Sequence, residues 1–216
     1  SEYIKNISKF SIRKLYKYLK MKKSKKIVLC FGLNPASTYV NACEEGNNGT
    51  SLTSVIYFLK SMIDLAKHFR QLYFVIRFKT MSAVDEMPNE LISEVKKTGN
   101  IEIQNDFNKV NSYELASISD LIIGKQTSIM EEALSAGKKA IYYDNENYMS
   151  SLDCPIYKLN NLVTKDFNGL KNRVKEIVDE KYDTSKEIEN FTNKYYRNQS
   201  GGNGFDLIKD IIVQSL

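Results

Sequence analysis

Residues 119–144, SDLIIGKQTSIMEEALSAGKKAIYYD, decide the fold. They begin with a short apolar run, Leu121–Gly124, of the kind expected for a strand buried on both faces. A polar turn follows, and a helical pattern then opens with Thr127 and Ser128. A second apolar run covers Ala140–Tyr143. This order predicts a βαβ unit whose helix N-terminus and backbone N–H groups would hold an anion such as a diphosphate.

Strand-like and helix-like segments alternate through most of the chain. The predicted strands are 27–32, 72–77, 101–104, 121–124, 140–143 and, more weakly, 156–159. The predicted helices are 51–69, 88–97, 112–118 and 127–136, with further helices at 167–180, 185–196 and 205–215. We therefore expect an α/β, Rossmann-like fold: a mostly parallel sheet of about six strands with helices on both faces, plus C-terminal helices.

Charge divides the chain into two parts. Residues 1–26 contain ten Lys or Arg residues and one acidic residue, a net charge of +9, whereas the whole 216-residue chain carries +5. Apolar residues in 3–21 recur at helical spacing, so we expect a basic amphipathic helix and linker at 1–26 and a nucleotide-binding domain at 27–216. The helix packs on this domain or a neighbouring one, lies on an anionic membrane, or is a solvated tail. The mildly acidic remainder argues against a nucleic-acid partner.

The cysteines and the single histidine exclude several chemistries. Cys30, Cys43 and Cys154 lie far apart without metal-ligand spacing, which predicts plain thiols in a reducing, cytoplasmic compartment. The sequence shows no signal-peptide pattern and no apolar run of bilayer length, so any membrane contact would be peripheral, at the inner face. His68 alone cannot build a multi-histidine metal site, and a surface or capping role is favoured for it. We expect neither a metal nor a cofactor.

In an open parallel sheet, ligands bind beyond the carboxyl ends of the strands. The residues there that could hold phosphate are Lys125, Gln126, Thr127, Ser128, Arg77 and Lys79, and further loop contacts are expected from Gly32, Asn34 and Asn105. Glu132 lies one turn into the helix, where a carboxylate suits the diol of a ribose. No catalytic residue can be named from the pattern.

Each of these features also has a purely structural interpretation. Thr127 and Ser128, followed by acidic residues, would equally cap a helix, and Gly137 would end it. Arg77 and Lys79 at a strand end would equally be solvated. The loop at 34–50 matches neither the GxGxxG nor the P-loop pattern.

The strand–turn–helix–strand run resembles the donor-nucleotide segment of GT-B glycosyltransferases, in which a small-residue turn leads to "EA" in the helix and then to "GKPV" and a strand. Glu131-Glu132-Ala133 is also similar to the UDP-N-acetylglucosamine 2-epimerases. The segment YYDNENY, residues 142–148, resembles the "YDxxxY" of the CDP-glycerol glycerophosphotransferase group. The resemblance covers about residues 70–150.

The resemblance implies the second, donor-binding half of a GT-B glycosyltransferase of surface polysaccharide or glycan synthesis, with a nucleotide-activated donor and a glycan or lipid-linked acceptor as partners. It implies that residues 126–128 bind the diphosphate and that Glu132 binds the ribose. A CDP-glycerol type polyol-phosphate transferase and a sugar-nucleotide epimerase are alternatives.

The sequence departs from the family pattern after the second strand. Where these families often carry "KPHP", this chain reads RFKT at 77–80, without the histidine and proline. That departure favours an alternative of another class, a catalytically inactive Rossmann-like interaction module. The general base of GT-B enzymes usually belongs to the first half, so this chain alone is expected to bind donor and to turn over poorly or not at all.

Overall fold

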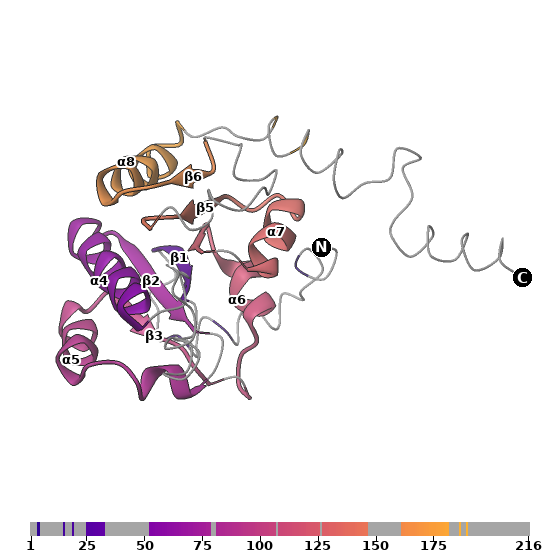
Figure 1. The fold of residues 1–216 in the computed structure, drawn as a ribbon. Coiled ribbons are helices and arrows are strands. Elements are labelled where there is room, and N and C mark those ends of the chain that lie inside the picture. Colours follow the sequence, from indigo (N-terminus) through magenta and orange to yellow (C-terminus); the bar gives the residue numbers. More distant parts are fainter. Residues whose placement is uncertain are drawn as a thin grey trace, which may run out of the picture.

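The computed structural model describes residues 4, 15, 19, 25–32, 52–78, 81–106, 108–125, 127–146, 161–181, 186 and 189. Its centre is a six-stranded sheet in the order β3-β2-β1-β4-β5-β6, and every neighbouring pair is parallel (Figure 1). The strands are β1 (Lys26–Phe31), β2 (Leu72–Arg77), β3 (Ile101–Ile103), β4 (Leu121–Gly124), β5 (Ala140–Tyr143) and β6 (Val163–Thr164). The predicted α/β class with a parallel sheet is therefore confirmed.

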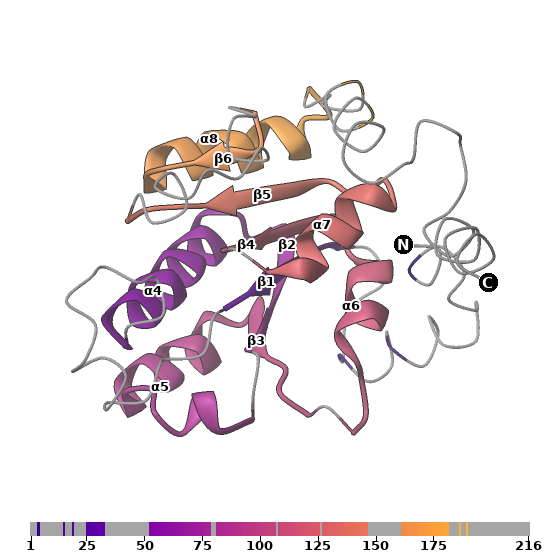
Figure 2. The same cartoon turned by 45° about the vertical axis from the view of Figure 1, so that its right-hand side comes forward.

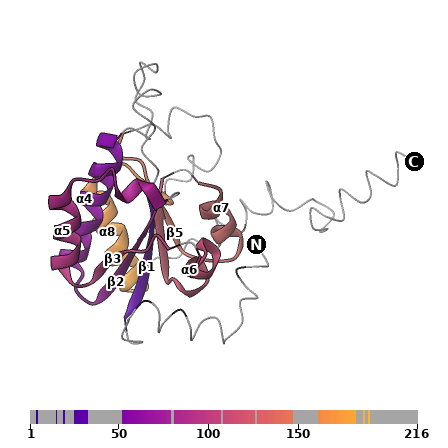
Figure 3. The same cartoon turned by 90° about the horizontal axis from the view of Figure 1, so that it is seen from below.

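Helices cover both faces of the sheet. They are α4 (Leu52–His68), α5 (Asn89–Thr98), α6 (Ser112–Ile118), α7 (Ser128–Ser135) and α8 (Phe167–Val178), with a 3₁₀ turn, η1 (Met81–Val84). Figure 3 shows α4, α5 and α8 on one side of the strands and α6 and α7 on the other. The crossover from β3 to β4 carries the chain from one face to the other, as the strand order requires.

The central strands are apolar because both of their faces are covered. All four residues of β4 and of β5 are buried, as are the last five of β1. The predicted bounds of β2, β4, β5 and α6 agree with the structure. The sixth strand is β6; the predicted strand at 156–159 and the helix at 205–215 lie outside the described residues, as does the helix at 185–196 except for residues 186 and 189.

The C-terminal end of α7 confirms the predicted glycine stop. Gly137 has a φ of 81°, in the left-handed region that glycine adopts without strain. Its N–H bonds the carbonyl of Leu134 at 2.9 Å, and the N–H of Lys138 bonds the carbonyl of Ala133 at 2.9 Å. This pair of bonds is a Schellman motif, which satisfies carbonyls that the helix leaves without intrahelical partners.

Three positions of the N-terminal segment are described, and all three belong to the core. Ile4, Leu15 and Leu19 are buried, and the Leu19 carbonyl accepts a 3.4 Å hydrogen bond from Tyr73 Oη. At these positions the segment packs on the domain, which favours the first of the three interpretations of the basic helix. The boundary at residue 26 stays a prediction. Among the helices of the described ranges, none is both long and apolar enough to cross a membrane.

Asn100 joins three segments at the amino end of the sheet. Its side chain is buried and donates from Nδ2 to the carbonyls of Ala66, Phe69 and Leu72, at 2.9, 3.2 and 3.0 Å. One side-chain amide therefore supplies the hydrogen-bond donor for carbonyls at the end of α4, in the following turn and at the start of β2.

We expect Asn100→Ala to lower the free energy of unfolding by about 2 kcal/mol, because buried carbonyls would lose their donor. Urea denaturation would measure this loss. Asn89→Ala removes an exposed asparagine from the start of α5 and should leave stability nearly unchanged. Equal effects of the two substitutions would contradict the structural role given to Asn100.

Candidate functional site

The carboxyl ends of β1, β4 and β5 lie side by side. The register pairs Phe31 with Gly124, and Gly124 with Tyr142, so the loops that follow these strands leave the same edge of the sheet. Figure 2 shows α6 and α7 next to each other on one face, with α4 on the other. The edge between α4 and α7 is thus where a ligand of an open α/β sheet is expected.

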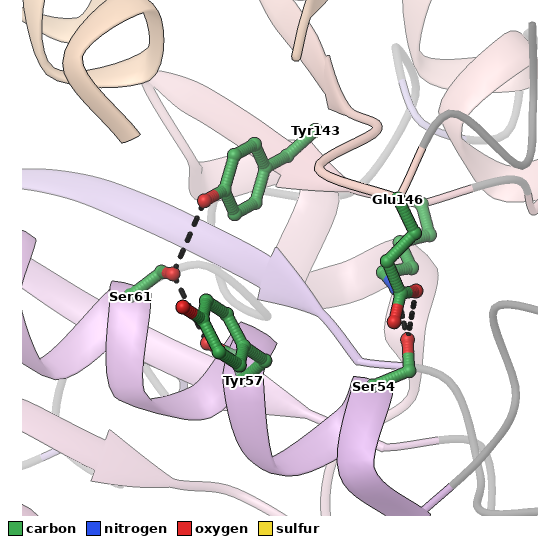
Figure 4. Close-up of polar contacts among 6 residues, drawn as sticks. Ser54, Tyr57, Ser61, Tyr143 and Glu146 are labelled. Atoms are coloured by element: carbon green, nitrogen blue, oxygen red, sulfur yellow. Dashed lines mark hydrogen bonds and ion pairs between the residues drawn. The ribbon is translucent and has the colours of Figure 1, made fainter. Parts of the chain in front are cut away.

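Lys125, a predicted phosphate contact, is held inside the fold. Its side chain is 6% exposed, and its ammonium lies 2.6 Å from Oε2 of Glu146, whose side chain is 28% exposed. It also bonds the hydroxyl of Ser54, a fully buried residue in the first turn of α4, and that hydroxyl donates to Glu146. Figure 4 shows Ser54 and Glu146 facing each other across the gap between α4 and the segment after β5.

A second contact joins α4 to β5. The Ser61 hydroxyl lies 3.2 Å from Tyr143 Oη and 3.0 Å from the carbonyl of Tyr57, as Figure 4 shows. Together with Ser54, it fixes α4 against the end of β5. The Lys125 cluster, defined as Lys125, Ser54 and Glu146, therefore ties together three segments of the carboxyl edge.

Arg77, another predicted phosphate contact, points into the protein. It is 1% exposed and donates from Nη1 to the carbonyl of Gln104 at 2.9 Å and from Nη2 to that of Val110 at 2.8 Å. These carbonyls lie at the two ends of the loop between β3 and α6, so Arg77 clamps that loop. A phosphate role for Arg77 stays a prediction, and Lys79 lies outside the described residues.

The start of α7 presents two hydroxyl residues at the carboxyl edge. Thr127 occupies the N-cap position in extended backbone, yet its side chain makes no capping hydrogen bond. Ser128 is the first residue of the helix and is exposed. A side-chain N-cap therefore does not account for these hydroxyls, and the first N–H groups of a helix attract anions. Gln126 lies outside the described residues.

Glu132, the predicted ribose contact, is half-buried on α7. Its Oε1 accepts a 3.0 Å hydrogen bond from Tyr113 Oη on α6. This bond, together with burial, raises the pKa of the Tyr113 phenol, so the phenol stays protonated and donating at neutral pH. The sequence analysis missed Tyr113, because no local pattern shows that two helices separated by β4 will meet.

Gly32 and Asn105, two predicted loop contacts, also make structural contacts at the strand ends, and a ligand role for them stays a prediction. A Cβ on Gly32 would lie 2.6 Å from the Phe78 ring, and the Gly32 N–H bonds the Arg77 carbonyl at 2.9 Å. Asn105 Oδ1 accepts a 3.3 Å hydrogen bond from the Phe78 backbone N–H. Both residues therefore fix the position of Phe78, which the sequence analysis did not single out. Asn34 lies outside the described residues.

Two further residues of reactive types, His68 and Cys30, are described by the structure. His68 is exposed at the far end of α4, with its ring edge-on to Phe69. Cys30 is buried within β1, and burial raises the pKa of its thiol and so suppresses the reactive thiolate. In the described part of the chain, no group of three His, Cys, Asp or Glu side chains could hold a metal ion.

A cavity of about 760 Å³ lies along the edge strand β3 and α5. Its walls include Val95, Ile101 and Glu102, and also the predicted loop contact Asn105. In the sheet, β2 and β1 lie between β3 and β4, the strand that leads to α7, and no residue of α7 lines the cavity. The cavity is therefore separate from the start of α7.

The sequence matches no protein-family model and no curated protein, whereas the fold is similar to solved structures. UDP-GlcNAc 2-epimerase from Neisseria meningitidis, bound to UDP-GlcNAc, aligns with a TM-score of 0.53 and 13% identity over 87% of this chain and 44% of that one. The wall teichoic acid polymerase TagF aligns with a TM-score of 0.58 and 16% identity over 96% and 47%. A variant of TagF with CDPG gives 0.58 and 14% over 95% and 45%.

At these identities the similarity is one of fold, and the chain spans slightly less than half the length of these structures. The resemblance to GT-B proteins is confirmed at that level. The polypeptide has the architecture of one Rossmann-like half of a GT-B fold, related in structure to enzymes of nucleotide-sugar and cell-wall polymer chemistry.

The Lys125 cluster predicts unequal effects of removing either charge. Glu146→Gln should lower the free energy of unfolding by about 2 kcal/mol, because it leaves a buried ammonium without its counter-charge. Lys125→Met should cost less, since the Glu146 carboxylate that remains is partly solvated. Urea denaturation of both variants checks the order.

The exposed pair Lys67–Glu94 offers the matched control, because its side chains are 42% and 43% exposed. Glu94→Gln should change stability much less than Glu146→Gln, since exposed ion pairs contribute little. If Lys125→Met proves the more damaging of the two cluster variants, the proposed order of burial costs is wrong.

Proposed function

We propose that this chain is the donor-binding half of a nucleotide-sugar-dependent GT-B glycosyltransferase of surface polysaccharide or glycan synthesis. One observation carries the proposal. At the carboxyl edge of a sheet with the order β3-β2-β1-β4-β5-β6, α7 opens with exposed Ser128, and half-buried Glu132 follows one turn later. That order and spacing suit a diphosphate at the helix start and a ribose diol on the carboxylate.

The diphosphate would be held mainly by backbone and hydroxyl groups. The N–H groups at the start of α7 and the hydroxyls of Thr127 and Ser128 would donate to its oxygens, and the helix dipole adds about half a positive charge. The Lys125 ammonium contributes little net charge, because Glu146 already neutralises it. Further cationic help would come from Lys79 and from groups of the acceptor-binding half.

Transfer itself would need the acceptor-binding half of the enzyme. In this interpretation the described residues bind and orient the donor, and the group that deprotonates the acceptor hydroxyl belongs to the other half. We therefore expect the chain alone to bind donor nucleotide without measurable turnover.

A polyol-phosphate transferase is the second candidate. The likeness to TagF and the YYDNENY segment after β5 support it. A sugar-nucleotide epimerase is favoured by the likeness to UDP-GlcNAc 2-epimerase. An inactive interaction module, the candidate from another class, is supported by the missing histidine after β2.

Calorimetric titration with UDP, CDP, CMP and GDP separates these candidates. We expect saturable binding with a dissociation constant in the micromolar range for at least one nucleotide. Glu132→Ala should weaken that binding about tenfold or more, because hydrogen bonds to charged groups contribute about 1.5–3 kcal/mol. Preference for CDP would favour polyol-phosphate transfer, and preference for UDP a sugar donor.

Glu131→Ala is the matched control for Glu132→Ala. It removes the adjacent carboxylate of the same helix without touching the proposed ribose contact, so affinity should change little. If the folded wild-type chain binds none of the four nucleotides, the donor-binding proposal is wrong for this chain, and the interaction module becomes the better explanation.

We also propose that residues 1–26 contact an anionic membrane surface, from the cytoplasmic side. The support is their charge of +9. Because Ile4, Leu15 and Leu19 are buried in the domain, such contact would be electrostatic rather than an insertion of apolar side chains.

Vesicle sedimentation tests this contact. The chain should bind vesicles containing phosphatidylserine at low salt and lose that binding at about 0.5 M salt, because salt screens the charges. It should not bind vesicles of phosphatidylcholine alone. Equal partitioning onto both kinds of vesicle would contradict an electrostatic contact.

A further inference from the structure

Glu132 on α7 is joined to α6 by a hydrogen bond from Tyr113. The 3.0 Å bond from Tyr113 Oη to Glu132 Oε1 joins two helices that cover the same face of the sheet (Figure 2). Both side chains are half-buried, so each is partly exposed while its neighbours restrict it. A glutamate on a helix surface would otherwise sample many rotamers.

The first turn of α6 gives Tyr113 a fixed place. Asn111 caps the helix by accepting from the Glu114 N–H at 2.8 Å, and the Glu114 carboxylate accepts from the Asn111 N–H at 2.9 Å. Tyr113 lies between the two members of this capping box, which holds the helix start in a single conformation.

The loop before α6 is fixed as well. Arg77 binds the carbonyl of Val110, the residue that precedes the cap Asn111, and it also binds the carbonyl of Gln104 at the far end of the loop. A buried guanidinium that makes two hydrogen bonds holds both ends of this loop in place. Arg77 thus fixes the loop, the capping box fixes the start of α6, and Tyr113 on that helix bonds the carboxylate of Glu132.

A carboxylate held in one position can accept hydrogen bonds from a vicinal diol without first being ordered. Ionised glutamate has about four acceptor positions over its two oxygens, so one carboxylate can accept from a phenol hydroxyl and from other donors at the same time. Ordering a flexible side chain at the moment of binding lowers affinity, and ordering it beforehand removes that cost. A vicinal diol, with two hydroxyl donors at fixed spacing, gains most from a carboxylate whose position is set.

We propose that Tyr113 is a positioning residue that sets the selectivity of this site for ribonucleotides over 2′-deoxyribonucleotides, by holding Glu132 in place for the ribose diol. This inference rests on the proposed function, since it concerns the same nucleotide site. It adds a residue on α6 that the pattern of the donor segment does not contain.

The test compares the affinities of UDP and CDP with those of dUDP and dCDP by calorimetry. For wild type we expect the ribonucleotide to bind about tenfold more tightly than its 2′-deoxy counterpart. Tyr113→Phe keeps the ring and removes the hydroxyl, and it should reduce this ratio to about threefold. Glu132→Gln should bring the ratio close to one, with or without Tyr113→Phe, because the two residues act as a unit.

Tyr73→Phe is the matched control. Tyr73 Oη bonds Glu102 Oε2 at 2.8 Å and the Leu19 carbonyl at 3.4 Å, so this substitution removes a phenol–carboxylate bond of the same chemistry, and one further bond, elsewhere in the fold. It should lower stability at least as much as Tyr113→Phe and leave the ribose selectivity unchanged. A purely structural role for Tyr113 would leave the selectivity unchanged in both variants.

The outcomes separate this inference from the proposed function. A folded wild type that binds no nucleotide overturns the donor-binding proposal, and this inference with it. A wild type that prefers ribonucleotides, together with a Tyr113→Phe variant of undiminished preference, overturns only the role of Tyr113. A wild type that binds both sugars equally overturns the ribose role of Glu132 and therefore this inference.

Discussion

The parallel pairing of β1 with both β2 and β4 is the constraint on which the rest of the structure depends. The loop after β1 leads to α4 on one face, whereas the loop after β4 leads to α7 on the other. In an open α/β sheet, the carboxyl edge between two such strands is where a ligand is expected. The Lys125 cluster joins the two sides of this edge, because Lys125 follows β4 and Ser54 belongs to α4.

The two cations that the structure describes at this edge, Arg77 and Lys125, both make contacts within the fold. Arg77 is committed to two loop carbonyls, and Lys125 to a carboxylate and a hydroxyl. Both would be expensive to bury without such partners, so their contacts explain why charged side chains are tolerated there at all. Through these contacts Arg77 joins the two ends of the loop before α6, and Lys125 joins α4 to the segment after β5.

The fold could be predicted from the sequence because its signals are local. Apolar runs such as β4 and β5 and the glycine stop of α7 depend on residues near one another in the chain. The partners of the candidate site could not be predicted. Nothing local in the sequence shows that Arg77 will bond carbonyls 27 and 33 residues away, or that Lys125 will pair with Glu146. Tyr113 was missed for the same reason.

The contact between Gly32 and Phe78 has a consequence for how such chains diverge. The Phe78 ring occupies the space that any side chain at position 32 would need. The two positions thus share one volume, and a larger residue at 32 requires a smaller one at 78. In chains of this architecture the sizes of the residues at these two positions should therefore vary together, so that a glycine after the first strand accompanies a large side chain after the second.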